Sequence, residues 1–208
     1  MRIHTTILAA ALCVPPAWAG DGHEGHEGHH QHAVQAANID RELASSSAQY
    51  VAPHVSLVRH DGKRVDFASE LDDGRPVFLN FIYTTCTAIC PPMSQTFATL
   101  QRKLGVDRNK VHMVSVSIDP EQDTPARLAE YAAQFGAGPQ WQFYTGSVEA
   151  SIAVQKAFGV WHGDKMSHTP LTLVRLAPGS EWVRYDGFVT AERLAQDFRL
   201  SVASRETR

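Results

Sequence analysis

Residues 77–92 read VFLNFIYTTCTAICPP, and most of the architecture follows from this segment. From Val77 to Tyr83 the run is almost entirely apolar, which is typical of a strand buried on both faces in a parallel sheet. Two cysteines and two prolines follow, and proline favours the first turn of a helix because the N–H it lacks would have no partner there. The segment therefore predicts a central strand, a loop with Cys86 and a helix that begins near Cys90.

The sequence that follows this segment predicts an alternation of helices and strands. Apolar residues recur at helical spacing from Met93 to Leu104, which indicates an amphipathic helix that ends at Gly105. The remaining patterns indicate strands at 111–118, 141–144, 171–176 and 182–185 and helices at 125–136, 147–158 and 190–202. Because this α/β order closes with a hairpin and a helix, we expect a thioredoxin-like fold with a central mixed sheet flanked by helices.

A β-hairpin precedes the central strand. Residues 55–58 and 64–67 alternate on either side of Asp61 and Gly62, and an Asp-Gly pair between two such runs favours a tight hairpin turn. The predicted fold class is therefore α/β and thioredoxin-like, with an N-terminal β-hairpin extension.

Length and composition limit the possibilities further. The chain has 208 residues, which suits one domain with extensions rather than two full domains. Apolar residues make up 43% of the chain and charged residues 20%, so most of it can bury a core. Its formal charge is −3 and no run of basic residues occurs, which argues against nucleic acid as a partner.

The N-terminus resembles a secretory signal peptide at residues 1–19. Its apolar run is shorter than the ~20 residues that span a bilayer, and it ends in the small-residue pattern Ala17-x-Ala19. We expect cleavage after Ala19 and a soluble periplasmic or otherwise exported chain without a stable membrane span. Retention of the uncleaved N-terminus as a membrane anchor is the main alternative.

A polar segment at residues 20–47 follows, which we interpret as a flexible tail ahead of a domain at 48–208. The tail carries five of the eleven histidines of the chain: His23, His26, His29, His30 and His32. Imidazole groups suit Cu(II), zinc and nickel. The cluster is therefore either an accessory metal site that captures or buffers copper, or a solvated linker that binds metals adventitiously.

Signal cleavage leaves Cys86 and Cys90 as the only cysteines, three residues apart. Both lie near the start of the predicted helix, whose N-terminus favours the thiolate, the form that attacks disulfides and binds metals. The pair can form a redox disulfide or hold a soft ion such as Cu(I), and the spacing alone does not choose between these roles. A purely structural bridge is a weaker alternative, because closing so short a loop removes little entropy from the unfolded chain.

His168 is the candidate for a third ligand. It precedes the strand that starts at Leu171, and in a thioredoxin-like fold this loop faces the cysteine loop. A proline directly before this strand commonly follows a cis peptide bond, so we expect one at Thr169-Pro170 and an imidazole that points at the two sulfur atoms. The alternative is a histidine in a surface loop without a partner.

Other residues that suggest chemistry receive structural interpretations. Met93 and Met113 follow core periodicities, which indicates packing rather than copper ligation. We expect Asp123 to cap the helix that starts at Pro125, and Asp119 to organise the turn before it. Four further histidines are expected to be ordinary surface or strand residues: His54, His60, His112 and His162.

Several motifs together resemble the Sco/SenC family of copper chaperones. They are the cysteine segment from Asn80 to Pro91, the run Asp119-Pro120-Glu121-Gln122-Asp123-Thr124-Pro125, the triplet Phe158-Gly159-Val160, and His168. The resemblance implies that Cys86, Cys90 and His168 are copper ligands. It also implies delivery of copper to the dinuclear copper site of cytochrome c oxidase, or reduction of the cysteines of that site. Family members often have an acidic residue where Ser167 stands here, so the sequence does not identify the group that orients the imidazole.

Two functions remain open on these residues. The first is a copper metallochaperone whose partner is the copper-site subunit of cytochrome c oxidase or another periplasmic copper or thiol protein. The second is a periplasmic thiol:disulfide oxidoreductase, in which one cysteine attacks a partner disulfide and the other resolves it without obligatory copper. A peroxiredoxin-type peroxidase is disfavoured, since Leu79 and Tyr83 stand where its Pro-x-x-x-Thr-x-x-Cys pattern needs proline and threonine.

Overall fold

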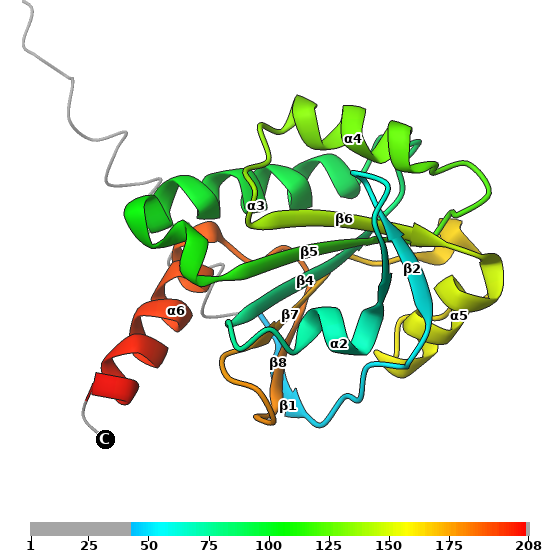
Figure 1. The fold of residues 1–208 in the computed structure, drawn as a ribbon. Coiled ribbons are helices and arrows are strands. Elements are labelled where there is room, and N and C mark those ends of the chain that lie inside the picture. Colours follow the sequence, from blue (N-terminus) through cyan, green and yellow to red (C-terminus); the bar gives the residue numbers. More distant parts are fainter. Residues whose placement is uncertain (1–42, 207–208) are drawn as a thin grey trace, which may run out of the picture.

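The computed structural model describes residues 43–206, which form one eight-stranded mixed sheet with helices on both faces (Figure 1). In sheet order the strands are β1 (Ser45–Ala48), β8 (Trp182–Asp186), β7 (Leu171–Arg175), β4 (Val77–Ile82), β5 (His112–Ser117), β6 (Trp141–Gly146), β2 (Ser56–Arg59) and β3 (Arg64–Asp66). The helices are α2 (Phe67–Leu71), α3 (Cys90–Leu104), α4 (Pro125–Gln134), α5 (Val148–Ala157) and α6 (Ala191–Glu206), with 3₁₀ turns at Gly105–Lys110 and Lys165–Ser167. The predicted α/β class with a central mixed sheet is confirmed.

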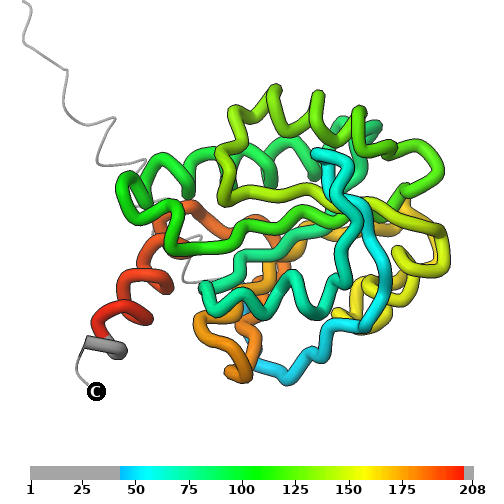
Figure 2. The backbone as a smooth tube through the Cα atoms, viewed as in Figure 1, coloured from blue at the N-terminus to red at the C-terminus, as the bar shows by residue number. Residues whose placement is uncertain are grey.

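The sheet combines a parallel centre with antiparallel edges. Strands β4, β5 and β6 are parallel, and the strands on either side of them pair antiparallel. The chain crosses from β4 through α3 to β5 and from β5 through α4 to β6 on the same face, and α2 and α5 lie on the opposite face (Figure 2). All three parallel strands therefore end at one edge of the sheet, where open α/β sheets hold their functional groups.

Strand β4 is the centre of the core, as its apolar run predicted. Every residue of β4 is buried, and the strand lies between parallel β5 and antiparallel β7. Asn80, its one polar side chain, accepts a hydrogen bond from the Ser115 hydroxyl at 2.7 Å, and Trp141 Nε1 donates to the same hydroxyl oxygen at 2.9 Å. These bonds offset the cost of placing the Ser115 hydroxyl and the Asn80 carbonyl group inside the sheet.

Strand β5 is buried at every position, although its sequence alternates between apolar and polar residues. The polar side chains find partners in the interior. His112 Nε2 lies 3.2 Å from the Tyr144 hydroxyl, and the Ser117 hydroxyl donates to Asp123 at 2.6 Å. Internal pairing of this kind is what allows a polar side chain to occupy a strand that has no solvent face.

The predicted hairpin is formed by β2 and β3, with Gly62 at its turn. Gly62 has a φ of 86°, which lies in the region that favours glycine. Because β2 also pairs with β6, the hairpin extends the central sheet instead of standing apart from it.

Strand β1 is an element that the sequence did not predict. It pairs antiparallel with β8, although the predicted flexible tail extended to residue 47. The sequence Ser-Ser-Ser-Ala shows no apolar alternation, and the strand forms because the edge of β8 offers free backbone hydrogen-bonding groups. The ordered part of the chain therefore starts before the predicted boundary at residue 48.

The predicted signal peptide at 1–19 and the histidines at 23–32 lie outside the described residues. Within residues 43–206, none of the helices combines the length and the apolar character needed to cross a bilayer. Export and membrane anchoring therefore stay predictions from the sequence.

Candidate metal and redox centre

Cys86 and Cys90 lie at the junction between β4 and α3, as predicted. Cys90 is the first residue of α3 and is fully buried, whereas Cys86 lies in the preceding loop and is 7% exposed. The N–H of Cys90 donates to the Cys86 sulfur at 3.4 Å, and both thiols are free. The helix begins here because Pro91 and Pro92 occupy its first turn, where an N–H has no partner within the helix.

The two thiols differ in acidity. Burial opposes ionisation of Cys86, but hydrogen bonds from the N–H and thiol of Cys90 and from the N–H groups of Ala88 and Ile89 outweigh it and lower the pKa of Cys86. Burial raises the pKa of Cys90 well above the usual range of a thiol. In the metal-free chain, Cys86 is therefore the more acidic thiol of the pair.

Tyr83 connects the cysteine loop with the loop that carries His168, a role that the sequence did not suggest. Burial, followed by the neighbouring Cys86 sulfur, raises the pKa of Tyr83 to about 12, so its hydroxyl stays protonated. This hydroxyl donates to Met166 Sδ at 3.8 Å, and the Lys165 ammonium group lies 5.7 Å from the centre of the Tyr83 ring. The two loops therefore lie against each other, as expected from the fold.

Asp123 holds the start of the cysteine loop, and its predicted role as a helix cap is wrong. The fully buried carboxylate accepts hydrogen bonds from the Thr84 N–H at 3.2 Å, from the Thr84 hydroxyl, and from the Ser117 hydroxyl at 2.6 Å. Thr124 caps α4 instead, because its hydroxyl accepts from the Arg127 N–H at 3.3 Å. The Asp123 carboxylate turns inward because donors at the ends of β4 and β5 need a buried acceptor.

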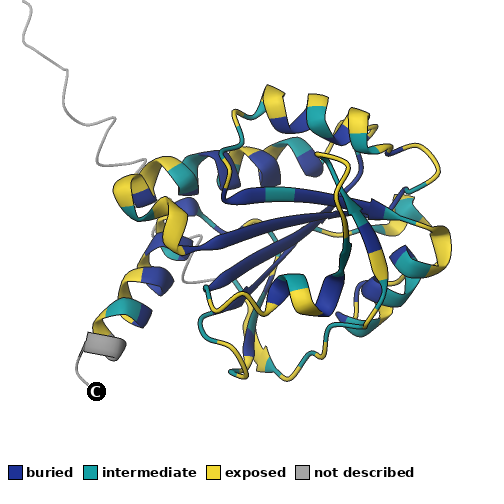
Figure 3. Cartoon of the chain, viewed as in Figure 1, coloured by how far each residue is buried: buried dark blue, intermediate teal, exposed yellow. Residues whose placement is uncertain are grey.

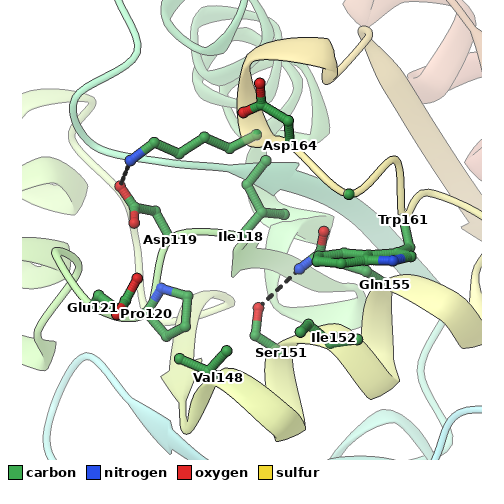
Figure 4. A pocket seen from close by; sticks show the side chains of 12 residues that line it. Ile118, Asp119, Pro120, Glu121, Val148, Ser151, Ile152, Gln155, Trp161 and Asp164 are labelled. Carbon is green, nitrogen blue, oxygen red and sulfur yellow. Dashed lines mark hydrogen bonds and ion pairs between the residues drawn. The ribbon is translucent and has the colours of Figure 1, made fainter.

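Asp119 organises the turn after β5, as predicted, since its carbonyl oxygen accepts from the N–H groups of Gln122 and Asp123. Its carboxylate also forms an ion pair with Lys165, which ties this turn to the histidine loop. The pair borders a cavity of about 250 Å³ into which Trp161 faces from the other side (Figure 4). Neither cysteine lines this cavity, so it lies beside the candidate site and not within it.

His168 follows the 3₁₀ turn Lys165–Ser167, which is capped by the side chain of Asp164. Its Nε2 lies 3.1 Å from the carbonyl oxygen of Phe81 in β4. Because a carbonyl oxygen only accepts, Nε2 carries the proton and Nδ1 keeps a free lone pair. Burial lowers the pKa of His168, which favours the neutral imidazole that a metal requires. The Phe81 carbonyl is thus the group that orients the ring. Ser167 stands where family members often have an acidic residue, and the sequence alone did not identify this orienting group.

The structure brings the histidine loop to the cysteine loop but does not assemble a finished three-ligand site. Across residues 43–206, no three side chains of cysteine, histidine, aspartate or glutamate lie close enough together to hold a metal ion. The predicted cis bond at Thr169-Pro170 is wrong, since every described peptide bond is trans. Trans is the intrinsically preferred form, and here the His168 ring rests on the backbone of β4. A three-ligand site therefore requires a rearrangement of these side chains.

The other residues singled out in the sequence are structural in this part of the chain. Met93 and Met113 are buried in the core, and His112 is a buried strand residue that contacts Tyr144, as expected. The remaining histidines of the domain are exposed or half-buried: His54, His60 and His162. The sequence patterns did not reveal the bonds that Asp123 makes to Thr84 or the ion pair of Lys165 with Asp119, because these partners are distant along the chain.

The fold and the cysteine site together define a thioredoxin-like thiol protein. The sequence model of the SCO1/SenC family matches residues 44–199, and the chain therefore belongs to this family, as the motifs indicated. The chain is 38% identical to the SCO1 protein homolog of Bacillus subtilis (strain 168) over 104 residues, which make up 50% of this chain and 53% of the relative. It spans about half the length of the curated relatives that it matches.

Solved structures of the family share the fold. ScoI of Arabidopsis thaliana, solved with copper bound, is 26% identical, with a TM-score of 0.62 over 74% of this chain and 99% of that one. BsSco, a member of the Sco family of cytochrome c oxidase assembly proteins in which a disulfide switch was identified, is 27% identical. Its TM-score is 0.63 over 75% of this chain and 95% of that one. One relative was thus solved with copper bound, and a disulfide switch was identified in another. Metal binding and disulfide formation are also the two roles that the sequence left open for Cys86 and Cys90.

Proposed function

We propose that this chain is an exported copper metallochaperone, which holds one copper ion with Cys86, Cys90 and His168 and delivers it to the dinuclear copper site of cytochrome c oxidase. The observation that carries the proposal is that two free thiols lie at and just before the start of α3, and that the facing loop, which Tyr83 contacts, carries an imidazole whose pKa is lowered by burial. Thiolates select Cu(I), and imidazole is a common ligand of copper. The copper-bound relative from Arabidopsis thaliana supports the choice of metal.

Each donor reaches the metal in a different way. Cys86 has the lowered pKa, so it ionises more readily than Cys90. Cys90 gives up its proton on binding, because only the thiolate ligates the ion. His168 offers Nδ1, since its Nε2–H is engaged by the Phe81 carbonyl oxygen. Such a three-ligand site stays open on one side, where a ligand of the recipient can attack the ion.

Delivery requires export and an accessible face. The signal sequence at 1–19 supports export to the periplasm, where the recipient is the copper-site subunit of cytochrome c oxidase or another copper or thiol protein. Met166 is 73% exposed and Phe188 is 46% exposed, and both belong to segments next to His168. These apolar side chains supply contact area for a recipient beside the site.

Titration with Cu(I) against a competing chelator tests the proposal. The starting chain carries alanine in place of the five histidines at 23–32, so that only the proposed site is counted. We expect one tightly bound equivalent, and an affinity at least about tenfold lower (~1.4 kcal/mol) in Cys86→Ser and in His168→Ala, because each change removes a ligand.

The variant His162→Ala is the matched control, since it removes an exposed histidine from the same loop. It should keep the affinity of the starting chain. If His168→Ala behaves like His162→Ala, the three-ligand assignment is wrong. If the starting chain binds no tight equivalent, the copper function itself is wrong.

A thiol:disulfide oxidoreductase is the second candidate, and the unequal acidity of the two thiols favours it. The Cys86 thiolate would attack one sulfur of a partner disulfide and release the other sulfur as a thiolate. Cys90 would then lose its proton and displace the partner from Cys86, so that the partner gains two thiols and the pair becomes a disulfide. Stoichiometric reduction of a disulfide substrate should survive His168→Ala and be lost in Cys86→Ser.

A further inference from the structure

We propose that the cavity between Trp161 and the Asp119–Lys165 ion pair is a docking site for an arginine side chain of the protein that receives copper from this chain. This inference rests on the copper function proposed above, because the occupant is assigned to the recipient. The cavity has a volume of about 250 Å³, which is below the ~300–1,000 Å³ of sites for drug-sized ligands. It therefore suits a single side chain.

Trp161 supplies the aromatic wall of the cavity. Its side chain is 38% exposed, whereas Trp141 and Trp182 are buried. Within residues 43–206, the indole of Trp161 forms no ring pair and no cation–π contact. Tryptophan is the aromatic side chain that binds a cation best, and guanidinium groups stack on its face. The ring is therefore available to a cation from another molecule.

Gln155 supplies a hydrogen-bond acceptor that the rest of the domain leaves unused. The residue belongs to α5, lines the cavity and is only 4% exposed. Its amide nitrogen donates to the Ser151 hydroxyl oxygen at 3.0 Å, and its amide oxygen is turned away from that bond (Figure 4). Among the described residues, no group donates a hydrogen bond to this oxygen. An acceptor in so enclosed a position is best satisfied by an N–H group that enters the cavity.

The orientation of this amide follows from its neighbours. The Ser151 hydroxyl donates to the carbonyl oxygen of Ser117 at 3.0 Å, so it can only accept from Gln155. The amide nitrogen of Gln155 must therefore face Ser151. The free group of Gln155 in the cavity is thus the oxygen, which accepts, and an occupant has to bring the donor.

The charges around the cavity favour a cation as that donor. Three carboxylates line it against one ammonium group: Asp119, Glu121 and Asp164 against Lys165. Lys165 pairs with Asp119, so it does not neutralise the other two carboxylates, which belong to exposed residues. This negative surplus attracts a cationic side chain and repels an anionic one. Arginine fits better than lysine, because its planar guanidinium can stack on an indole while its edge donates to an amide oxygen.

The cavity lies next to the candidate copper site. Trp161 and Lys165 belong to the segment that leads to His168, and the Lys165 ammonium group lies 5.7 Å from the centre of the Tyr83 ring. Tyr83 connects the two loops of that site. Neither cysteine lines the cavity, so an arginine bound there leaves the sulfur atoms uncovered. A recipient anchored in this way is held beside the copper ligands without blocking them.

Binding of Nα-acetyl-arginine amide to the full chain tests the cavity. The readout is the NMR shift of the backbone amides of Gly163 and Asp164, two residues that line it. We expect saturable binding with a Kd on the order of millimolar, as suits one anchored side chain. Nα-acetyl-citrulline amide has nearly the same shape without the charge, and it should bind at least about tenfold more weakly. Equal binding of the two probes, or no saturable binding, overturns the inference.

Two variants separate the contributions of the ring and the acceptor. Trp161→Ala and Gln155→Met should each weaken binding of the arginine probe at least about fivefold. Phe188→Ala is the matched control, since it removes a ring that is 46% exposed and does not line the cavity. It should leave the binding of the probe unchanged. Trp161 is exposed, so its variant is expected to fold, and unchanged binding in Trp161→Ala overturns the inference.

Transfer of Cu(I) from the loaded chain to the metal-free copper-site subunit of cytochrome c oxidase tests the docking role. Trp161→Ala should slow transfer at least about fivefold and keep the Cu(I) affinity of the parent, because the cavity holds no copper ligand. Unchanged transfer overturns the inference. If the parent is a dimer that the arginine probe dissociates, the occupant is a second copy and the assignment to the recipient is wrong. Absence of transfer by the parent, with probe binding intact, overturns the proposed copper delivery and not the arginine-binding cavity.

Discussion

The two loops that meet at the candidate site are held in different ways. The cysteine loop is fastened to the core, since Thr84 is bonded to the buried carboxylate of Asp123 and Cys90 is fully buried. It follows strand β4, which is buried along its whole length (Figure 3). The histidine loop is mostly exposed, and side-chain contacts of Lys165, Met166 and His168 hold it against the rest of the domain. Folding therefore places the sulfur atoms, whereas the imidazole is placed by contacts that metal binding can exchange.

Removal of the Asp123 carboxylate should have the largest effect. Asp123→Ala leaves the buried Ser117 hydroxyl and the half-buried N–H and hydroxyl of Thr84 without their acceptor, so the free energy of unfolding should fall by about 3 kcal/mol. Denaturant unfolding followed by circular dichroism measures the loss. Glu181→Gln removes an exposed carboxylate and should stay within about 0.5 kcal/mol of the parent. A loss below about 1 kcal/mol in Asp123→Ala would mean that the core does not fix the cysteine loop.

Within the cysteine loop, the two thiols should react at different rates. In the reduced, metal-free chain, iodoacetamide should modify Cys86 at least about tenfold faster than Cys90, a difference of ~1.4 kcal/mol, since the thiolate is the reactive form. The rate at Cys86 should rise with pH at values below the ordinary thiol pKa of ~8.5. Mass spectrometry after short exposure measures both sites. The denatured chain is the control, in which the two cysteines should react alike, and equal rates in the folded chain would contradict the assignment.

The position of the cysteine loop could be predicted from the sequence, because the residues that determine it are close to it in the chain. An apolar run at 77–83 places the strand, and prolines directly after Cys90 place the helix start. The position of the His168 ring is not a local property. It depends on the Phe81 carbonyl, 87 residues earlier in the chain, and nothing at Ser167 points to it. Pattern analysis therefore singled out His168 as a candidate ligand but not the contact that holds its ring.

Two further differences have the same origin in distant contacts. Asp123 and Thr124 are both good helix caps, and Thr84 and Ser117 decide between them by claiming the carboxylate of Asp123. The polar strand β1 exists because β8 offers a free edge, a fact that its own sequence does not contain. Short-range patterns thus predict the elements, whereas tertiary partners choose among the side-chain roles that those patterns leave open.

Loss of the charge on Asp119 should have a moderate effect that is confined to the histidine loop. Asp119→Asn removes the charged partner of Lys165, and the free energy of unfolding should fall only modestly, because solvent screens the exposed lysine end of the pair. Hydrogen exchange at the amides of Ser167 and His168 should accelerate, while exchange at Cys90 should not. Adding Lys165→Met to Asp119→Asn should bring little further change, since the pair is already broken. Equal acceleration in both loops would contradict their separate attachment.

The smallest effect should come from Asp164, whose side chain accepts the Met166 N–H at 2.9 Å and caps the turn before His168. Asp164→Ala should lower the free energy of unfolding by about 0.5 kcal/mol or less, because the turn is short and exposed and its cap stabilises little beyond itself. Exchange of the Met166 amide should nevertheless become faster, and Asp164→Asn should restore most of its protection, since asparagine also accepts. A global loss above about 1 kcal/mol would mean that the histidine loop is part of the cooperative core. The imidazole would then be as firmly placed as the sulfur atoms, and a three-ligand copper site would have to form without a rearrangement of the histidine loop.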